Sequence, residues 1–359
     1  MKLETKPDFE EVKQRWRAYW AGEVCGRPLV VASVRRNGAA AMGAGEGRYR
    51  NALGGAYAAE LARNEACVAG TRYLAEGLPF FSPDHGPDQF AAFLGARLEF
   101  AEQGSDHTNW VTPMVDDWSE FLPLAVDPGG ATYRSVLDYA RMLGEHARGR
   151  YLVGICDFHS NADALLAIRG AERLCMDFYD CPDLVAEAMR QVRALYEPVY
   201  NAIYEAAGIG EETGSIGWAP FWSDGKFATI QCDFICMVSP EIARKYILPA
   251  LEEEAAFLDR CVYHLDGPGA LVHLDDILAI EDIDVIQWVS GAGQPAMHTW
   301  LDVLKKCQAA GKGLQIMGVG LDAIKGLHRE LSPQGVVYCV NAKTEQEVEE
   351  ICRWLEANT

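Results

Sequence analysis

Short apolar runs alternate along the chain with longer stretches in which apolar residues recur at helical spacing. Most strand-like runs are short and mainly apolar, as in parallel strands that helices cover on both faces. They lie at residues 28–34, 78–82, 151–158, 214–221, 261–266, 284–289, 313–318 and 336–340. The clearest helical patterns lie at residues 182–207, 240–258, 298–310 and 345–357. Eight strands with intervening helices predict an α/β fold, the (β/α)8 or TIM barrel.

An N-terminal helix and two insertions are expected around this barrel. Residues 8–22 carry apolar positions at helical spacing, so residues 1–25 are predicted to form a helical extension. Residues 95–135 are expected to form an irregular loop or β-arm after the second strand, and residues 217–231 a loop rich in Trp and Gly after the fourth. Because no linker or low-complexity tract divides the chain, residues 1–359 are expected to form one domain.

Composition narrows the classes of partner. The chain has 32 Lys and Arg against 52 Asp and Glu, a net charge of −20, which argues against a nucleic acid or an anionic membrane as the main partner. The first residues are polar, and no apolar run is long enough for a membrane span. Eleven cysteines are scattered without a CxxC pair, as reduced core cysteines are. We therefore expect a cytoplasmic protein that acts on a small molecule.

A polar pair ends the predicted strand at residues 261–266. His264 and Asp266 are two residues apart, so both side chains point to the same side of the strand. In barrels of parallel strands, functional groups gather at the carboxyl ends of strands. Cys339 has a similar position on the last predicted strand. These three residues are candidate metal ligands; the structural alternatives are a hydrogen-bonded core histidine, an Asp-Gly turn and a small buried cysteine.

Polar residues also follow two other predicted strands. Asp157 and His159 end the third strand with both side chains on one side, which suits a second acid–base or metal cluster. Asp84 and His85 follow the second strand and would face the same rim, as substrate-binding residues. A structural role, such as the capping of the helix after His159, is the alternative.

Tryptophans are dense near the predicted rim. Trp218, Trp222 and Trp288 could form a cage for a methylated ammonium group or the wall of a pocket for an aromatic methyl ether. The alternative is that they pack the insertions against the barrel.

Several longer segments carry a family resemblance. They are Arg27-Pro-Leu-Val-Val-Ala-Ser-Val-Arg-Arg36, Cys181-Pro-Asp-Leu-Val185 before a long helix, Ile230-Gln-Cys-Asp-Phe-Ile-Cys-Met-Val-Ser-Pro-Glu241, Tyr263-His-Leu-Asp-Gly267, and Leu331-Ser-Pro-Gln-Gly335 with Cys339 and Lys343-Thr-Glu-Gln-Glu-Val348 after it. These segments are similar to the uroporphyrinogen decarboxylase superfamily. In type they are nearest to its corrinoid-dependent zinc methyltransferases.

The resemblance implies a zinc site and a corrinoid partner. In these methyltransferases, zinc is bound by the His and Cys of a His-x-Cys segment and by a Cys at the end of the last strand. The matching positions here are His264, Asp266 in place of a Cys, and Cys339. A polar residue of the family that faces the substrate lies near Asp233, which joins Asp157 and His159 as a candidate catalytic residue. Cobalamin would come only with a partner, because the chain has no corrinoid-binding domain.

Two departures from the family pattern bear on the chemistry. Asp266 offers a harder oxygen ligand than the thiolate it replaces. The related methionine synthases have a Glu near the end of the next strand, whereas residues 284–289 end without an acid. Both departures weaken the match to a thiolate-rich zinc site.

Three functions remain open on the sequence. The first is a methyltransferase that moves a methyl group between a corrinoid protein and a small acceptor or donor, assisted by zinc. The second is a lyase, such as a decarboxylase, that works without a metal through Asp233, His264 and Asp157. The third is a non-catalytic barrel that binds a small molecule. The protein partners that we expect are a corrinoid protein and a second copy of the chain in a homodimer.

Overall fold

A seven-stranded sheet organises the molecule, in the order β2-β1-β13-β12-β11-β10-β9. The computed structural model describes residues 2–36, 48–100 and 108–359. Six neighbouring strands run parallel, and only β2 is antiparallel, to β1. The seven strands are β1 (Leu29–Arg35), β2 (Thr71–Ala75), β9 (Phe227–Gln231), β10 (Arg260–Asp266), β11 (Val285–Val289), β12 (Gly313–Val319) and β13 (Val336–Val340).

Three short ladders accompany the main sheet. They are β3 (Phe80–Phe81) parallel to β6 (Leu152–Val153), β4 (Leu98–Glu99) antiparallel to β5 (Trp110–Val111), and β7 (Ser215–Ile216) antiparallel to β8 (Trp222–Ser223). The β4–β5 ladder confirms the predicted β-arm, although residues 101–107 of that insertion lie outside the described part of the chain.

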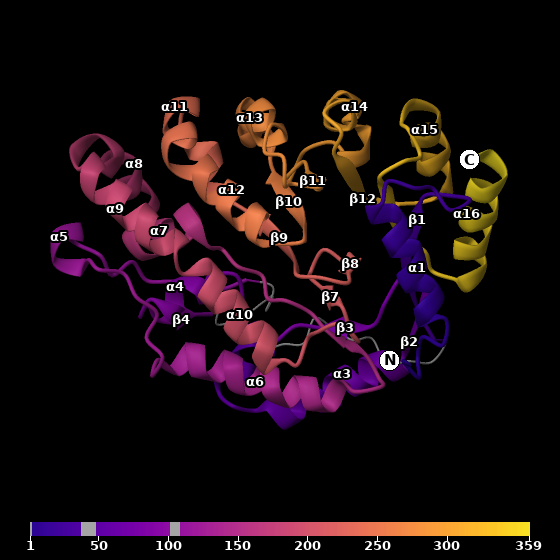
Figure 1. The fold of residues 1–359 in the computed structure, drawn as a ribbon, viewed down its shortest axis with the longest axis horizontal. Coiled ribbons are helices and arrows are strands. Elements are labelled where there is room, and N and C mark those ends of the chain that lie inside the picture. Colours follow the sequence, from indigo (N-terminus) through magenta and orange to yellow (C-terminus); the bar gives the residue numbers. More distant parts are fainter. Residues whose placement is uncertain (1, 37–47, 101–107) are drawn as a thin grey trace.

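Helices cover the strands from two sides. In Figure 1, α11, α13, α14 and α15 lie along one side of the molecule and α3 and α6 along the opposite side, with the strands between them. The helices are α1 (Phe9–Trp20), α2 (Arg48–Leu53), α3 (Tyr57–Ala69), α4 (Gln89–Phe93), α5 (Trp118–Phe121), α6 (Ala131–Ala147), α7 (Asn161–Arg169), α8 (Ala171–Asp180), α9 (Pro182–Arg193), α10 (Tyr196–Ala206), α11 (Pro240–Ile242), α12 (Leu248–Phe257), α13 (Leu274–Leu278), α14 (Leu301–Ala309), α15 (Leu321–Glu330) and α16 (Glu345–Asn358). Short turns of other helical types are η1 (Asp233–Met237), η2 (Ala243–Ile247), η3 (Pro268–His273) and η4 (Met297–Thr299).

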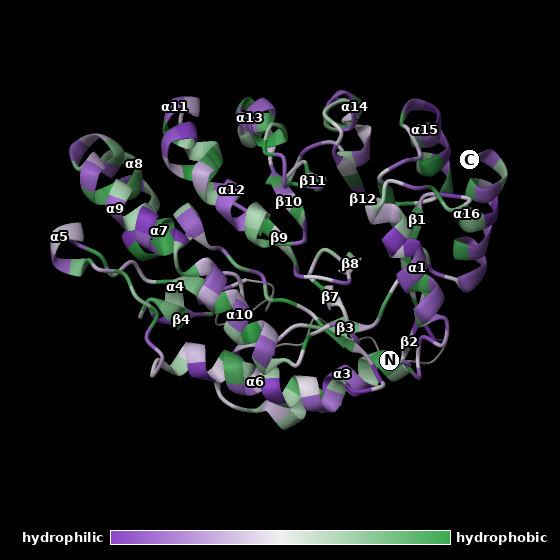
Figure 2. Cartoon of the chain, viewed as in Figure 1, coloured by the Kyte–Doolittle hydropathy of each residue, from purple (hydrophilic) through white to green (hydrophobic). Residues whose placement is uncertain are grey.

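The helices are amphipathic, as the sequence pattern predicts. In α9, the buried residues Val185, Ala188, Met189 and Val192 recur at helical spacing, and Figure 2 shows hydrophilic and hydrophobic residues mixed along the outer helices. Burial of such apolar faces against neighbouring helices and strands stabilises the helices.

One predicted strand is in the wrong place. Only Ser215–Ile216 of the segment 214–221 is a strand, and the long strand of this region is Phe227–Gln231, inside the segment that was predicted to be a loop. All five residues of β9 are buried and pair with β10 along its length. β2 was also not predicted. The hydrogen-bonded order of strands ends at β2 and β9. The described residues therefore form an α/β fold around a mostly parallel seven-stranded sheet, and they show no closed ring of eight strands.

The N-terminal helix covers the amino ends of the strands. Its residues Phe9, Val12 and Trp16 pack in one cluster with a side chain from each of eight strand-like segments. These side chains are Leu29, Leu78, Leu152, Ile216, Phe227, Val262, Val285 and Val337. The interior at this end is thus filled with apolar side chains.

The structure bears on two further expectations from the sequence, the state of the cysteines and the membrane-spanning segments. All eleven cysteines are free, as expected for reduced cysteines. Among the described helices, none combines the length and the apolar character that a membrane crossing requires.

Candidate metal centre

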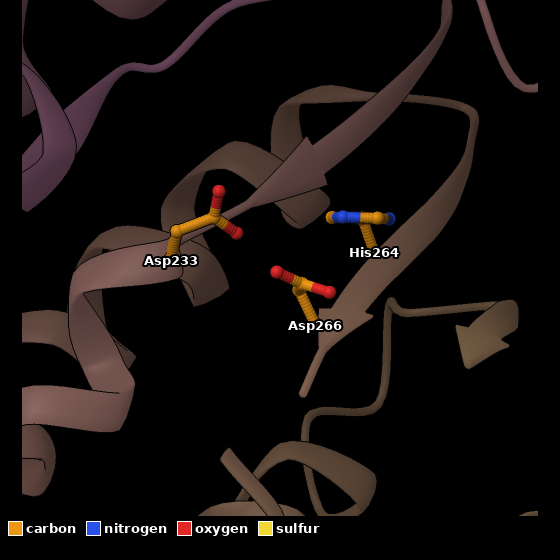
Figure 3. A group of neighbouring side chains, drawn as sticks. All are labelled: Asp233, His264 and Asp266. Carbon is orange, nitrogen blue, oxygen red and sulfur yellow. The ribbon is translucent and has the colours of Figure 1, made fainter. Parts of the chain in front are cut away.

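Three polar side chains meet at the carboxyl ends of β9 and β10. Asp233 begins η1, which follows β9 after one residue, whereas His264 and Asp266 are on β10. One potential ligand atom from each residue lies within 4.8 Å of the other two. In Figure 3 the imidazole and both carboxylates point toward a common space. One nitrogen and two oxygen ligands at this spacing suit a divalent cation.

Asp233 has an unsatisfied oxygen in this group. Its Oδ1 is buried and has no hydrogen-bond partner within the described part of the chain. The turn that carries it is fixed by Asp163, whose carboxylate accepts hydrogen bonds from the main-chain nitrogens of Asp233 (2.9 Å) and Phe234 (2.8 Å). A buried carboxylate oxygen without a partner is costly, so the residues present fit a bound cation.

His264 is held on two sides. Its Nδ1 forms a hydrogen bond with Oε1 of Gln287, the residue paired with it on β11. The ring of Trp218 lies at 5.2 Å and nearly perpendicular to the imidazole. With Nδ1 used by Gln287, Nε2 is the nitrogen that can bind a metal, and a carbonyl oxygen on the other ring nitrogen is a usual partner of metal-bound histidines.

Asp157 and His159 form a second pair beside this group. His159 Nε2 lies 3.8 Å from Asp157 Oδ2, and Gln231 Nε2 donates to Asp157 Oδ1 at 3.0 Å. Burial raises the pKa of Asp157 to about 6, with Asp84 and Asp233 adding to the shift and His159 and His264 opposing it. A carboxyl group with a pKa near neutrality can exchange protons at physiological pH.

The pKa of His159 is also displaced. Burial alone would lower it, but the surrounding carboxylates, with that of Asp157 first, raise it above its ordinary value. The surroundings therefore make Asp157 a weaker acid and His159 a stronger base. This is the acid–base cluster that the sequence suggested, and it stands next to the metal group.

Cys339, which the sequence predicts as a third metal ligand, lies outside the group that the structure brings together. The described residues bring Asp233, and not Cys339, together with His264 and Asp266. Cys339 is on β13, three strands away from β10 in the sheet, where its Sγ accepts a hydrogen bond from Gln315 at 3.3 Å. Burial raises the pKa of this thiol to about 11. The proposed ligand set is corrected accordingly.

Three residues predicted to bind substrate are instead in the core. His85 is fully buried, its Nε2 is 2.7 Å from Ser135 Oγ, and burial lowers its pKa to about 4. Trp222 packs against Phe9 of α1, which places it near the amino ends of the strands. Trp288 is buried against Trp300 at 5.2 Å. In the structure, all three side chains pack in the core.

Two other residues predicted to bind substrate lie near the site. Trp218 contacts His264, as described above. Asp84 is buried, and its Oδ1 accepts hydrogen bonds from the main-chain nitrogen of Asp157 (3.0 Å) and from Gln89 Nε2 (3.2 Å). Asp84 therefore supports the loop that carries Asp157.

Three buried glutamines were not predicted from the sequence to take part in the site. Gln231, Gln287 and Gln315 are on β9, β11 and β12, and each is at most 2% exposed. Each stands between two apolar residues, as Ile-Gln-Cys, Ile-Gln-Trp and Leu-Gln-Ile. A polar residue at the centre of an apolar strand must find buried partners, and this was the available signal.

Comparison with known proteins shows a likeness to solved structures. No protein-family model matches the sequence, and no curated protein matches it significantly. A solved structure described as a methyltransferase from Methanosarcina mazei is similar, with a TM-score of 0.57 and 14% sequence identity, over 97% of this chain and 97% of the other. At this identity the likeness shows a shared fold along nearly the whole chain.

Proposed function

We propose that this protein is a metal-dependent methyltransferase of the uroporphyrinogen decarboxylase superfamily, built on a (β/α)8 barrel. The observation that carries the proposal is the Asp233–His264–Asp266 group, which stands at the carboxyl ends of parallel strands. Two further observations support it: the likeness to a structure described as a methyltransferase, and sequence segments similar to those of the family.

Zinc is the metal that we propose. His264 Nε2 and one oxygen each of Asp233 and Asp266 would supply three ligands and leave a fourth position for the methyl acceptor, as in catalytic zinc sites. Bound there, zinc would supply a Lewis acid that lowers the pKa of the acceptor. Other divalent cations that accept oxygen ligands are competitors for the same set.

The protein's own side chains have separable tasks in this proposal. Gln287 fixes the imidazole of His264, and Trp218 covers one edge of it. Asp157 Oδ2 accepts the proton that the acceptor loses, and His159 Nε2, at 3.8 Å, stabilises the carboxylate while it is ionised. The other participant in methyl exchange would be a cobalamin carried by a separate corrinoid protein.

One observation favours a second candidate, a lyase that works without metal. Asp157 and His159 can exchange protons with a substrate independently of the metal group, because neither is among its ligands. The two candidates separate on chelation: a methyltransferase of the proposed kind loses activity with its metal, whereas a metal-free lyase keeps it.

Metal binding is the direct test. Protein purified without added metal would be analysed for bound ions and titrated with Zn²⁺ by calorimetry. Asp233→Asn removes one ligand and should weaken Zn²⁺ binding by roughly 10- to 100-fold or more. Losses of that size follow even from changes to residues around a metal's ligands. Asp282→Asn, the same change at an exposed residue, is the matched control and should bind as the wild type does. No binding in the wild type, or equal binding in both variants, would contradict the proposal.

A further inference from the structure

A chain of hydrogen bonds crosses four adjacent strands behind His264. Gln287 Oε1 on β11 is bonded to His264 Nδ1 on β10, and Gln287 Nε2 donates to Gln315 Oε1 on β12 at 2.6 Å. Gln315 Nε2 then donates to Cys339 Sγ on β13 at 3.3 Å. The strands are in register here, since His264 pairs with Gln287 and Gln287 with Gln315. The side chains therefore form one continuous row.

The direction of this row is fixed by its acceptors. Gln287 Nε2 also lies 3.5 Å from Met317 Sδ, and a thioether sulfur can only accept a hydrogen bond. The amide nitrogen of Gln287 therefore belongs on the side of Gln315 and Met317, and its oxygen on the side of His264. Since a carbonyl oxygen only accepts, His264 must donate from Nδ1.

Burial makes the alternative arrangement costly. Gln287 is 1% exposed and Gln315 is 2% exposed, so a reversed amide would lose its partners without gaining water. A reversed Gln287 would place its oxygen against Met317 Sδ and against Gln315 Oε1, two atoms that cannot donate. If Gln315 were reversed as well, the Cys339 thiol would donate to it, but the oxygen of Gln287 would still face Met317 Sδ, which has no hydrogen to donate. The contact with Met317 therefore favours the direction in which the nitrogen of Gln287 faces Gln315.

We infer that Gln287, oriented by Gln315, Met317 and Cys339, is a positioning residue that holds neutral His264 in the Nδ1–H tautomer and leaves Nε2 as the ligand nitrogen. This gives Cys339 a role at the far end of the row in place of direct ligation. The tautomer is a property of the chain itself, while its use in metal binding rests on the proposed function.

The tautomer can be read by long-range nitrogen–proton NMR on metal-free protein in which the eight histidines carry ¹⁵N. His264→Gln would assign the signal. At a pH where the ring is neutral, wild-type His264 should show protonated Nδ1 and unprotonated Nε2. Detection of Nε2–H as the main form of His264 in the wild type would overturn the inference.

Two substitutions separate positioning from packing. Gln287→Met keeps the length of the side chain but has no acceptor oxygen, so the Nε2–H form should appear; Gln287→Glu keeps an acceptor, so Nδ1–H should persist. Zinc affinity should fall roughly 10- to 100-fold in Gln287→Met and stay closer to the wild type in Gln287→Glu. An unchanged tautomer in a folded Gln287→Met would refute the inference.

The outcome separates the inference from the proposed function. One outcome is that the His264 tautomer changes with Gln287 as expected while neither the wild type nor any variant binds metal. The inference about Gln287 then stands and the metal proposal fails. The other outcome is that metal binds at Asp233, His264 and Asp266 while the tautomer of His264 is the same in the wild type and in Gln287→Met. The metal proposal then stands and the inference about Gln287 fails.

Discussion

Glu254 is a buried acid whose protonation state should affect stability. It lies on α12, is 2% exposed, and accepts hydrogen bonds from Ser160 Oγ (2.7 Å) and Asn161 Nδ2 (3.2 Å). Asn161 has a φ of 47°, in the left-handed region that non-glycine residues rarely adopt. The Glu254 network thus supports an unfavourable backbone conformation two residues after His159.

The ionisation of Glu254 predicts a pH-dependent stability. Burial raises its pKa to about 8, with Asp163 adding to the shift and the bonds from Ser160 and Asn161 opposing it. Between the ordinary value of 4.5 and about 8, the folded state keeps a proton that the unfolded state releases, so stability falls as pH rises through this window. The loss is on the order of a few kcal/mol.

Glu254→Gln should remove this loss. Urea unfolding from about pH 5 to about pH 8 should show the variant gaining stability relative to the wild type as pH rises. Glu252→Gln, at an exposed neighbour on the same helix, is the control and should keep a constant difference from the wild type. A constant difference for Glu254→Gln as well would show that Glu254 ionises normally in the folded protein.

At the scale of elements, α1 should contribute to the stability of the fold but not to metal binding. Trp16 is completely buried and contacts the rings of Tyr19, Trp20 and Phe221. Trp16→Ala should lower the free energy of unfolding by about 3–5 kcal/mol, through the cavity that it leaves. Because α1 lies at the amino ends of the strands and the metal group at the carboxyl ends, folded Trp16→Ala should bind Zn²⁺ as the wild type does. Weakened binding per folded molecule would show that the two ends are coupled.

The misplaced strand shows what the sequence pattern could and could not settle. Apolar runs identified β1, β10, β11, β12 and β13 well, since helices cover them and periodicity reflects that burial. Residues 214–221 and Phe227–Gln231 are both apolar and both buried, and only pairing with β10 decides which becomes the long strand. Pairing is a tertiary property, so the pattern alone could not choose between them.

The same limit applied to the site. The period of two along β10 correctly placed His264 and Asp266 together, because that relation is local. The third member had to come from another strand end, and Asp233 and Cys339 were equally available in the sequence. The turn in η1, held by Asp163, brings Asp233 to the pair, whereas the position of β13 keeps Cys339 away.

At the scale of the whole molecule, charge complicates any metal assay. A net charge of −20 attracts divalent cations to many surface carboxylates, so bound metal by itself does not identify a site. Stability gives a sharper measure, because an ion that binds only the folded protein stabilises it by about 2.7 kcal/mol at 100 times its dissociation constant. Weak surface binding contributes little at the same concentration.

Thermal unfolding with Zn²⁺ and with a chelator should therefore locate the metal. Zn²⁺ should raise the Tm of the wild type and of Asp282→Asn by a few degrees, and the chelator should reverse this. Asp233→Asn and Asp282→Asn each remove one negative charge from the protein, so a nonspecific effect of net charge would be equal in the two. A shift that disappears only in Asp233→Asn would place the cation among Asp233, His264 and Asp266; an equal shift in both would place it elsewhere.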